Sequence, residues 1–205
     1  GSGSLVEIGT WLGRSPLHTA AGLASAGHDQ RLHCFDGYTW GRSDGKAADL
    51  PLRPGDSFQE YFEANVSRFA ELIRVHRTRI ADISWPGDPV ELLFLDAPKK
   101  QSDITRCLEA FGASLAAGRS YIAIQDYLYF PAYALAVCMD LLRDHLELTH
   151  VVLGGSTVCF RVVRPFDLRA AKPAEWALRR WSPAQVDAAW DRILAPLPAA
   201  ARDRL

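Results

Sequence analysis

Short apolar runs alternate with segments of helical periodicity along most of the 205-residue chain. The apolar runs predict strands, at about residues 5–9, 31–36, 78–82, 91–96 and 120–126. Apolar positions at helical spacing predict helices between them, at Ser15–Ala26, Phe58–Ile73 and Ser102–Ala117. Strands that alternate with helices of this length are typical of βαβ units, which build a parallel sheet.

The segment after the fifth predicted strand changes this pattern. A helix is expected near Ala132–His145, followed by two strand-like stretches, Leu146–Leu153 and Ser156–Val163, with Gly154 and Gly155 between them. Strands joined by so short a turn pair antiparallel. The sequence therefore predicts an α/β, Rossmann-like fold, in which a seven-stranded, mostly parallel sheet ends in a C-terminal antiparallel hairpin and carries helices on both faces.

The C-terminal residues 166–205 carry Trp176, Trp181 and Trp190 at intervals suited to helices. We expect a domain of residues 1–165, with residues 166–205 as a C-terminal helical extension packed on it. Core packing is the default role of these tryptophans, and a dimer or substrate contact is the alternative.

The segment Gly37–Asp56 is rich in Gly, Asp, Arg and Pro and lacks apolar periodicity, so we expect a long loop after the second strand. It is either a functional lid or a disordered linker. Tyr38 and Trp40 favour the lid, because large aromatic side chains are costly to leave exposed. In a lid they would exclude water from the site and stack on the substrate.

The charge and composition narrow the choice of partner. The formal net charge is −1, so we expect no basic face for nucleic acid or an anionic membrane. No apolar run approaches the roughly 20 residues that a membrane-spanning helix needs. A small molecule is the expected partner, and a homodimer or flanking domains of a longer chain are left open.

The four cysteines lie without CxxC spacing in a chain large enough to fold without disulfides. We therefore expect free, buried thiols in a reducing compartment, which places the protein in the cytoplasm. These cysteines are Cys34, Cys107, Cys138 and Cys159.

The ends of the first two predicted strands carry the first candidate site residues. Gly9 permits a close backbone approach, and Gly13 opens a helix whose free N–H groups favour electron-rich ligand atoms. This G-x-x-x-G turn lacks the third-position glycine of the dinucleotide fingerprint. Asp36 ends the second strand, where a carboxylate can accept hydrogen bonds from ribose hydroxyls. Taken alone, Asp36 is equally compatible with a loop cap.

Two further carboxylates, Asp96 and Asp126, follow the fourth and fifth predicted strands. Neighbouring strands lie about 4.8 Å apart, so these side chains should converge at one edge of the sheet. Two carboxylates so close repel each other unless a cation, a proton or a lysine compensates. Mg²⁺ is one candidate cation, since it prefers oxygen ligands. In the alternative interpretation, one aspartate is solvated, the other caps a helix, and Lys99 and Lys100 are a solvated pair.

The residues Val6–Ser15 and Phe94–Lys99 resemble the motifs of a known family. The first segment is similar to the cofactor motif of class I S-adenosylmethionine-dependent methyltransferases, especially the branch of antibiotic-sugar O-methyltransferases and methyltransferase family 24. The second resembles the Asp-x-x-Lys segment of catechol and caffeoyl-coenzyme A O-methyltransferases. The likeness covers about Leu5 to Val163. It implies a class I methyltransferase fold and methyl transfer to an oxygen of a small hydroxylated acceptor such as a sugar, a phenol or a natural product.

The resemblance also implies roles for individual residues. The methionine part of S-adenosylmethionine would lie at the glycine turn, the ribose at Asp36 and the adenine at Asp82 and Ile83. The implied cofactor-binding residues are Glu7, Gly9, Thr10, Gly13, Ser15, Asp36, Asp82, Ile83 and Asp96. Asp96 and Asp126 would hold Mg²⁺ or a similar divalent cation, and Lys99 would be the general base. Asp96, Lys99 and Asp126 are thus the predicted catalytic residues.

Two departures from the family pattern concern the metal. Related sugar methyltransferases often carry a histidine after the fourth-strand aspartate and another before the fifth-strand aspartate, where this chain has Ala97-Pro98-Lys99 and Gln125. Catechol-type enzymes follow the second aspartate with Asn or Asp, and Tyr127 stands there in this chain.

Two other interpretations stay open. An NAD(P)-dependent oxidoreductase would share the strand–glycine–helix start and the ribose acid, although the missing glycine and the terminal hairpin count against it. A non-catalytic methyltransferase-like module of a larger protein is the other. The six histidines show no metal-ligand spacing, and His33 and His150 are the two worth testing for a functional role.

Overall fold

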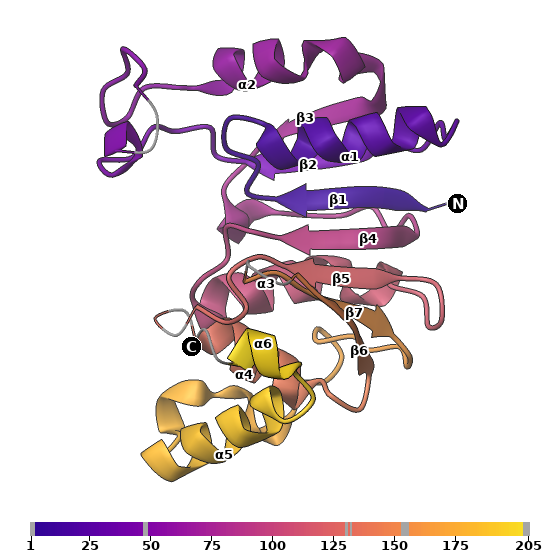
Figure 1. The fold of residues 1–205 in the computed structure, drawn as a ribbon, viewed down its shortest axis with the longest axis vertical. Helices are drawn as coiled ribbons and strands as arrows, with labels where there is room; N and C mark the ends of the chain where they lie inside the picture. Colours follow the sequence, from indigo (N-terminus) through magenta and orange to yellow (C-terminus); the bar gives the residue numbers. More distant parts are fainter. Residues whose placement is uncertain (1–2, 47–48, 130, 132, 153–155, 203–205) are drawn as a thin grey trace.

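The computed structural model describes residues 3–46, 49–129, 131, 133–152 and 156–202 (Figure 1). Seven strands form one sheet in the order β3-β2-β1-β4-β5-β7-β6. The first five pair in parallel, and β7 pairs antiparallel with both β5 and β6. The strands are β1 (Ser4–Ile8), β2 (Leu32–Asp36), β3 (Ile73–Arg77), β4 (Val90–Leu95), β5 (Tyr121–Ile124), β6 (Leu146–Val151) and β7 (Val158–Val162). The predicted sheet with its C-terminal antiparallel hairpin is confirmed, while the predicted turn residues Gly154 and Gly155 lie outside the described residues.

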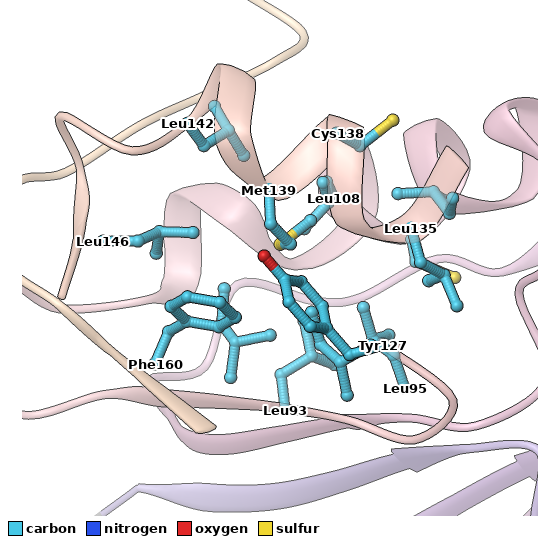
Figure 2. Packing of buried hydrophobic residues seen from close by; sticks show 14 of the residues in the cluster. Leu93, Leu95, Leu108, Tyr127, Leu135, Cys138, Met139, Leu142, Leu146 and Phe160 are labelled. Carbon is cyan, nitrogen blue, oxygen red and sulfur yellow. The ribbon is translucent and has the colours of Figure 1, made fainter. Parts of the chain in front are cut away.

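Side chains that alternate along β1 face two separate layers of helices. Leu5 packs with residues of α1 (Arg14–Ser25) and α2 (Gln59–Val66), whereas Val6 and Ile8 pack with those of α3 (Gln101–Phe111) and α4 (Ala134–Leu141). Figure 2 shows the second layer, in which leucines of β4 meet the apolar faces of α3 and α4. The period of two in the strands thus covers both faces of the sheet, as predicted.

The predicted third strand at 78–82 is wrong, because the strand lies at Ile73–Arg77. The predicted helix Phe58–Ile73 is correspondingly too long, since α2 ends at Val66 and a 3₁₀ segment covers Ser67–Leu72. β3 is an edge strand with polar residues at alternate positions, so its apolar signal is weak. Its place is set by pairing with β2, which begins with Leu32 opposite Ile73.

The tail packs on the sheet through α4. Helix α5 (Pro183–Leu194) begins with a capping box between Ser182 and Gln185, and its Ile193 is buried in the same core as α4. Trp176 is buried as well, and its indole N–H donates to the Thr105 hydroxyl at 2.8 Å. A short helix, α6 (Ala199–Arg202), follows. These contacts agree with core packing of the tail, and the division into residues 1–165 and 166–205 stays a prediction.

The described helices include none that is long and apolar enough to cross a membrane. The prediction of free, buried thiols is confirmed for Cys34, Cys107 and Cys138, and Cys159 is free but only partly buried.

The aromatic residues of the long loop are buried in the core, whereas the lid interpretation expects them to be available to a ligand. Tyr38 and Trp40 are 0% and 2% exposed and pack with Phe58 against the α1 and α2 layer. The loop returns on itself, since the Trp40 amide donates to Asp56 O at 2.8 Å and the Phe58 amide to Tyr38 O at 3.1 Å. The rings of Tyr38 and Trp40 are removed from water by the core, and this burial anchors the loop. The side chains that were expected to cover the site therefore fix the loop instead.

Replacing Trp40 by alanine should therefore destabilise the protein by about 3–5 kcal/mol in urea denaturation, because it removes a buried ring. The control is Trp11→Ala, whose side chain is 38% exposed and whose loss should cost under about 1 kcal/mol. Equal effects of the two substitutions would mean that Trp40 does not anchor the loop.

Candidate active site

The carboxyl ends of β1 and β4 meet at a glycine. The carbonyl of Ile8 accepts hydrogen bonds from the amides of Asp96 and Ala97, both at 2.9 Å. Gly9 has φ 89°, and a Cβ added there would lie 2.5 Å from the backbone nitrogen of Ala97. Only glycine combines this backbone conformation with this approach. The contact places Asp96 directly beside the turn that follows β1.

Asp36 holds the same turn from the side of β2. One oxygen of its carboxylate accepts the amides of Thr10 and Trp11 at 2.9 and 3.0 Å, and the other accepts the amide of Tyr38 at 2.8 Å. The Thr10 hydroxyl donates to the Tyr38 oxygen at 3.2 Å. A carboxylate has about four acceptor sites, so one site of Asp36 stays open for a ligand hydroxyl. The predicted ribose role is compatible with this geometry and stays a prediction.

Glu7 is a buried acid beneath the glycine turn, 1% exposed. Its Oε1 accepts the Ser15 hydroxyl at 2.5 Å, and its Oε2 is buried without a partner within the described structure. Burial raises the pKa of Glu7 to about 8, opposed by the Ser15 hydrogen bond and reinforced by the charges of Asp96 and Asp36. Glu7 and Ser15, both predicted cofactor residues, therefore form one polar unit at the start of α1.

Asp96 and Asp126 converge as predicted, with Lys99 between them. The Lys99 ammonium lies 2.7 Å from Asp126 Oδ2 and 3.6 Å from Asp96 Oδ1. Burial raises the pKa of Asp96, partly offset by the Lys99 charge, and the neighbouring Asp126 raises it further. Burial would also raise the pKa of Asp126, but hydrogen bonds from Lys99, Ser156 and Gln125 and the Lys99 charge lower it overall. The interpretation of two independent, solvated or capping aspartates is therefore wrong.

Sequence reasoning missed the residues that orient Asp126. The Ser156 hydroxyl donates to Asp126 Oδ1 at 3.0 Å, and the Gln125 amide donates to the same oxygen at 3.3 Å. Gln125 is itself held by the Thr157 hydroxyl. The backbone of Asp126 has φ 59°, a left-handed conformation that is uncommon among non-glycine residues but that aspartate adopts more readily than most. Only the pairing of β5 with β7 brings these residues together, so the sequence offered no signal for Ser156.

The residues around this carboxylate pair do not fit the predicted metal site. The described part of the chain contains no group of three or more His, Cys, Asp or Glu that could hold a metal ion. Tyr127, which follows Asp126, is 4% exposed and points into the core against Phe160 and Met139 (Figure 2). The Lys99 ammonium stands where a cation bound to Asp126 would lie.

The predicted adenine residues lie at the end of a 3₁₀ turn, Ile80–Asp82, that follows β3. Asp82 is exposed and pairs with Arg79 at 2.9 Å, whereas Ile83 is buried in the core and its carbonyl accepts Arg106. The residue that follows β3 directly is Thr78, whose amide donates to Asp36 O at 2.8 Å. The adenine role of Asp82 and Ile83 stays a prediction.

A cleft of about 500 Å³ opens between the start of α1 and the ends of β4 and β5. It contains the predicted site residues Thr10, Ser15 and Asp96 together with residues that were not predicted as cofactor or catalytic residues, among them Arg14 and Gln125. Six of the residues that line it are Thr10, Trp11, Arg14, Ser15, Asp96 and Gln125.

His33 lies near the amino end of β2, away from the carboxyl end that carries Asp36. Its ring contacts that of His76 at 2.9 Å and packs edge-on against Trp85. Burial lowers the pKa of both histidines. His33 thus belongs to a packed aromatic cluster, and His150 lies exposed on β6.

The pKa of Glu7 gives a test of this geometry. The unfolded chain loses the Glu7 proton near the ordinary pKa of 4.5 and the folded protein only near 8, so this acid costs stability increasingly as the pH rises between these values. Glu7→Gln cannot ionise. The free energy of unfolding of Glu7→Gln, measured in urea denaturation relative to that of the wild type, should therefore rise by on the order of 2–4 kcal/mol between pH 5 and pH 9. The exposed Glu60→Gln is the control, and a Glu7→Gln difference that does not change with pH would contradict the buried acid.

Comparison with known proteins identifies the family and supports the fold of this chain. The family model described as "Methyltransferase domain", methyltransferase family 24, matches residues 6–127. The fold is similar to that of the O-methyltransferase NovP, with a TM-score of 0.61, 17% identity, and coverage of 79% of this chain and 72% of that one. The fold is also similar to that of CalS11, a TDP-rhamnose 3'-O-methyltransferase of calicheamicin biosynthesis, with a TM-score of 0.54, 19% identity, and coverage of 78% of this chain and 71% of that one.

A third similar structure is the phosphoethanolamine N-methyltransferase 1 of Haemonchus contortus, with a TM-score of 0.60, 12% identity, and coverage of 93% of this chain and 46% of that one. A comparison with curated proteins found no match. At these identities the structures show the fold, and the family match decides against the oxidoreductase interpretation. Since that match spans more than half of the chain, the protein belongs to methyltransferase family 24 and is an S-adenosylmethionine-dependent methyltransferase.

Proposed function

We propose that this enzyme transfers a methyl group to a hydroxyl oxygen of a small acceptor such as a sugar, a phenol or another natural product. The observation that carries the proposal is the Lys99 ammonium at the mouth of the site, between Asp96 and Asp126. A fixed cation stabilises the negative charge that develops on a hydroxyl oxygen as it loses its proton. The same cation would disfavour a protonated amine.

The charges around the glycine turn suit S-adenosylmethionine. This cofactor supplies an electrophilic methyl group on a sulfonium and also carries an ammonium, so it has more positive than negative charge. Glu7, Asp36 and Asp96 supply acidic groups at the turn, and the buried Glu7 Oε2 has no protein partner in the described structure. The pyrophosphate of a dinucleotide would meet repulsion from Asp36 and Asp96, whereas Glu7, with its pKa raised to about 8, is protonated at neutral pH.

Three residues are assigned to the acceptor. Asp96 lines the cleft and takes the proton of the acceptor hydroxyl through its carboxylate oxygen. Lys99 donates to Asp126, so it acts as a hydrogen-bond donor and positive charge, rather than as the general base that the resemblance implied. Asp126 orients the ammonium. Arg14 lies at the start of α1 in the same cleft and is placed to pair with a ligand carboxylate.

The proposal also includes the expected partner and compartment of the enzyme. The small acceptor is the partner, without nucleic acid or membrane, and the free thiols suit a cytoplasmic enzyme. A Mg²⁺-assisted variant of the reaction was expected from the resemblance, but the donor set around Asp126 does not favour it.

Calorimetric titration tests cofactor binding. S-adenosylmethionine and its demethylated product should bind with micromolar affinity, and NAD(H) should not. Asp36→Ala should weaken the binding by about 1–3 kcal/mol, because ribose hydroxyls and turn amides lose their partner. Asp167→Ala is the matched control, since Asp167 also accepts a backbone amide, from Arg169 at 2.9 Å, but on an exposed turn. Unchanged affinity for Asp36→Ala would remove Asp36 from the site.

Formation of the demethylated cofactor in the presence of sugars, phenols and amines tests the acceptor class. Methylated products of hydroxylated acceptors are expected, and Asp96→Asn should lower their rate by roughly 100-fold or more, the usual range for loss of a proton acceptor. Turnover of amines alone would overturn O-methylation, and failure to bind the cofactor would favour a non-catalytic module.

A further inference from the structure

The carboxylate pair of Asp96 and Asp126 already contains a cation of its own. Lys99 stands three residues after Asp96, and its ammonium lies 3.6 Å from Asp96 Oδ1 and 2.7 Å from Asp126 Oδ2. All three side chains are one-third to two-fifths exposed. Lys99 is tethered to the site by the chain, so it offsets one of the two negative charges without having to be recruited from solution.

The second oxygen of Asp126 is occupied as well. Ser156 and Gln125 both donate to Oδ1, while Lys99 donates to Oδ2. A divalent ion bound to Asp126 would have to displace the ammonium or lie beside it. The first route leaves a positive charge without its partner, and the second places like charges within a few ångströms of each other.

Within the described residues, no further metal-binding side chain offsets this conflict. Mg²⁺ takes near-octahedral coordination at about 2.0–2.1 Å and usually keeps several waters, so its binding here would depend on the two carboxylates that Lys99 already faces. The described residues offer two carboxylates here and no third metal-binding side chain, because Tyr127 turns its ring into the core. The Ser156 hydroxyl is already committed to Asp126.

We propose that Lys99 is the resident cation of this active site and takes the place of a divalent metal, so that the enzyme needs none. This inference rests on the proposed O-methylation. Lys99 stabilises the acceptor oxygen while the hydroxyl proton passes to Asp96. A bond then forms between that oxygen and the methyl carbon, and the bond from this carbon to sulfur breaks, leaving a neutral thioether. No oxidant, reductant or metal enters this balance.

Manganese binding, followed by the electron paramagnetic resonance signal of free Mn²⁺, tests the proposal without reference to turnover. The wild-type protein, with the demethylated cofactor bound, should leave the free-ion signal unchanged up to millimolar Mn²⁺. Lys99→Ala and Lys99→Gln remove the ammonium and should bind Mn²⁺ at least tenfold more tightly than the wild type. Lys100→Ala is the matched control and should behave as the wild type.

Binding of Mn²⁺ by the wild type at micromolar concentration would overturn the proposal. So would wild-type and Lys99 variants that alike fail to bind the ion, because Lys99 would then not be what excludes it. These results are independent of methyl transfer, so failure of this inference and failure of the proposed function can be told apart.

Methyl-transfer assays provide a second, independent test of the proposal. Methyl transfer by the wild type should persist in excess EDTA, and Lys99→Ala should lower kcat by 100-fold or more with cofactor affinity within threefold of the wild type. Lys99→Arg, which keeps the charge, should recover at least tenfold of that loss. Loss of wild-type activity in EDTA that Mg²⁺ restores would overturn the proposal.

Discussion

The close approach of β4 to the turn after β1 is the contact on which the rest of the site depends. The Ile8 carbonyl takes two amides from the end of β4, and Gly9 leaves no room for a side chain between the two segments. The Asp36 carboxylate fixes the other side of the turn by accepting the backbone amides of Thr10 and Trp11. These short-range constraints set the distance between Asp96, the cleft and the buried Glu7.

An excess of acid at one edge of the sheet gives the site its chemical character. Burial holds the pKa of Glu7 and Asp96 above their ordinary values, whereas Lys99 and two neutral donors keep the pKa of Asp126 low. The acids nearest the glycine turn are only partly compensated by protein groups, and the acid farthest from it is paired with a lysine. In the proposed function, the first serve cofactor binding and the second serves acceptor chemistry.

The anchoring of the long loop shows how the core can take residues that seem functional in sequence. Tyr38 and Trp40 follow a strand end, where binding residues are common. Their rings nevertheless pack beneath the loop, and Tyr38 contributes its hydroxyl oxygen to the glycine turn. These aromatic side chains thus hold the loop and the glycine turn together from the core.

The sequence by itself determined the α/β class, the terminal hairpin and the convergence of Gly9, Asp36, Asp96 and Asp126, because apolar runs locate buried strands and each strand end follows directly in the chain. Tertiary structure alone decided the position of β3, the burial of Tyr38 and Trp40, and the role of Ser156 in orienting Asp126. It also placed the Lys99 ammonium between two carboxylates that lie on different strands. These features arise from pairing and packing between segments distant in sequence, which local periodicity does not encode.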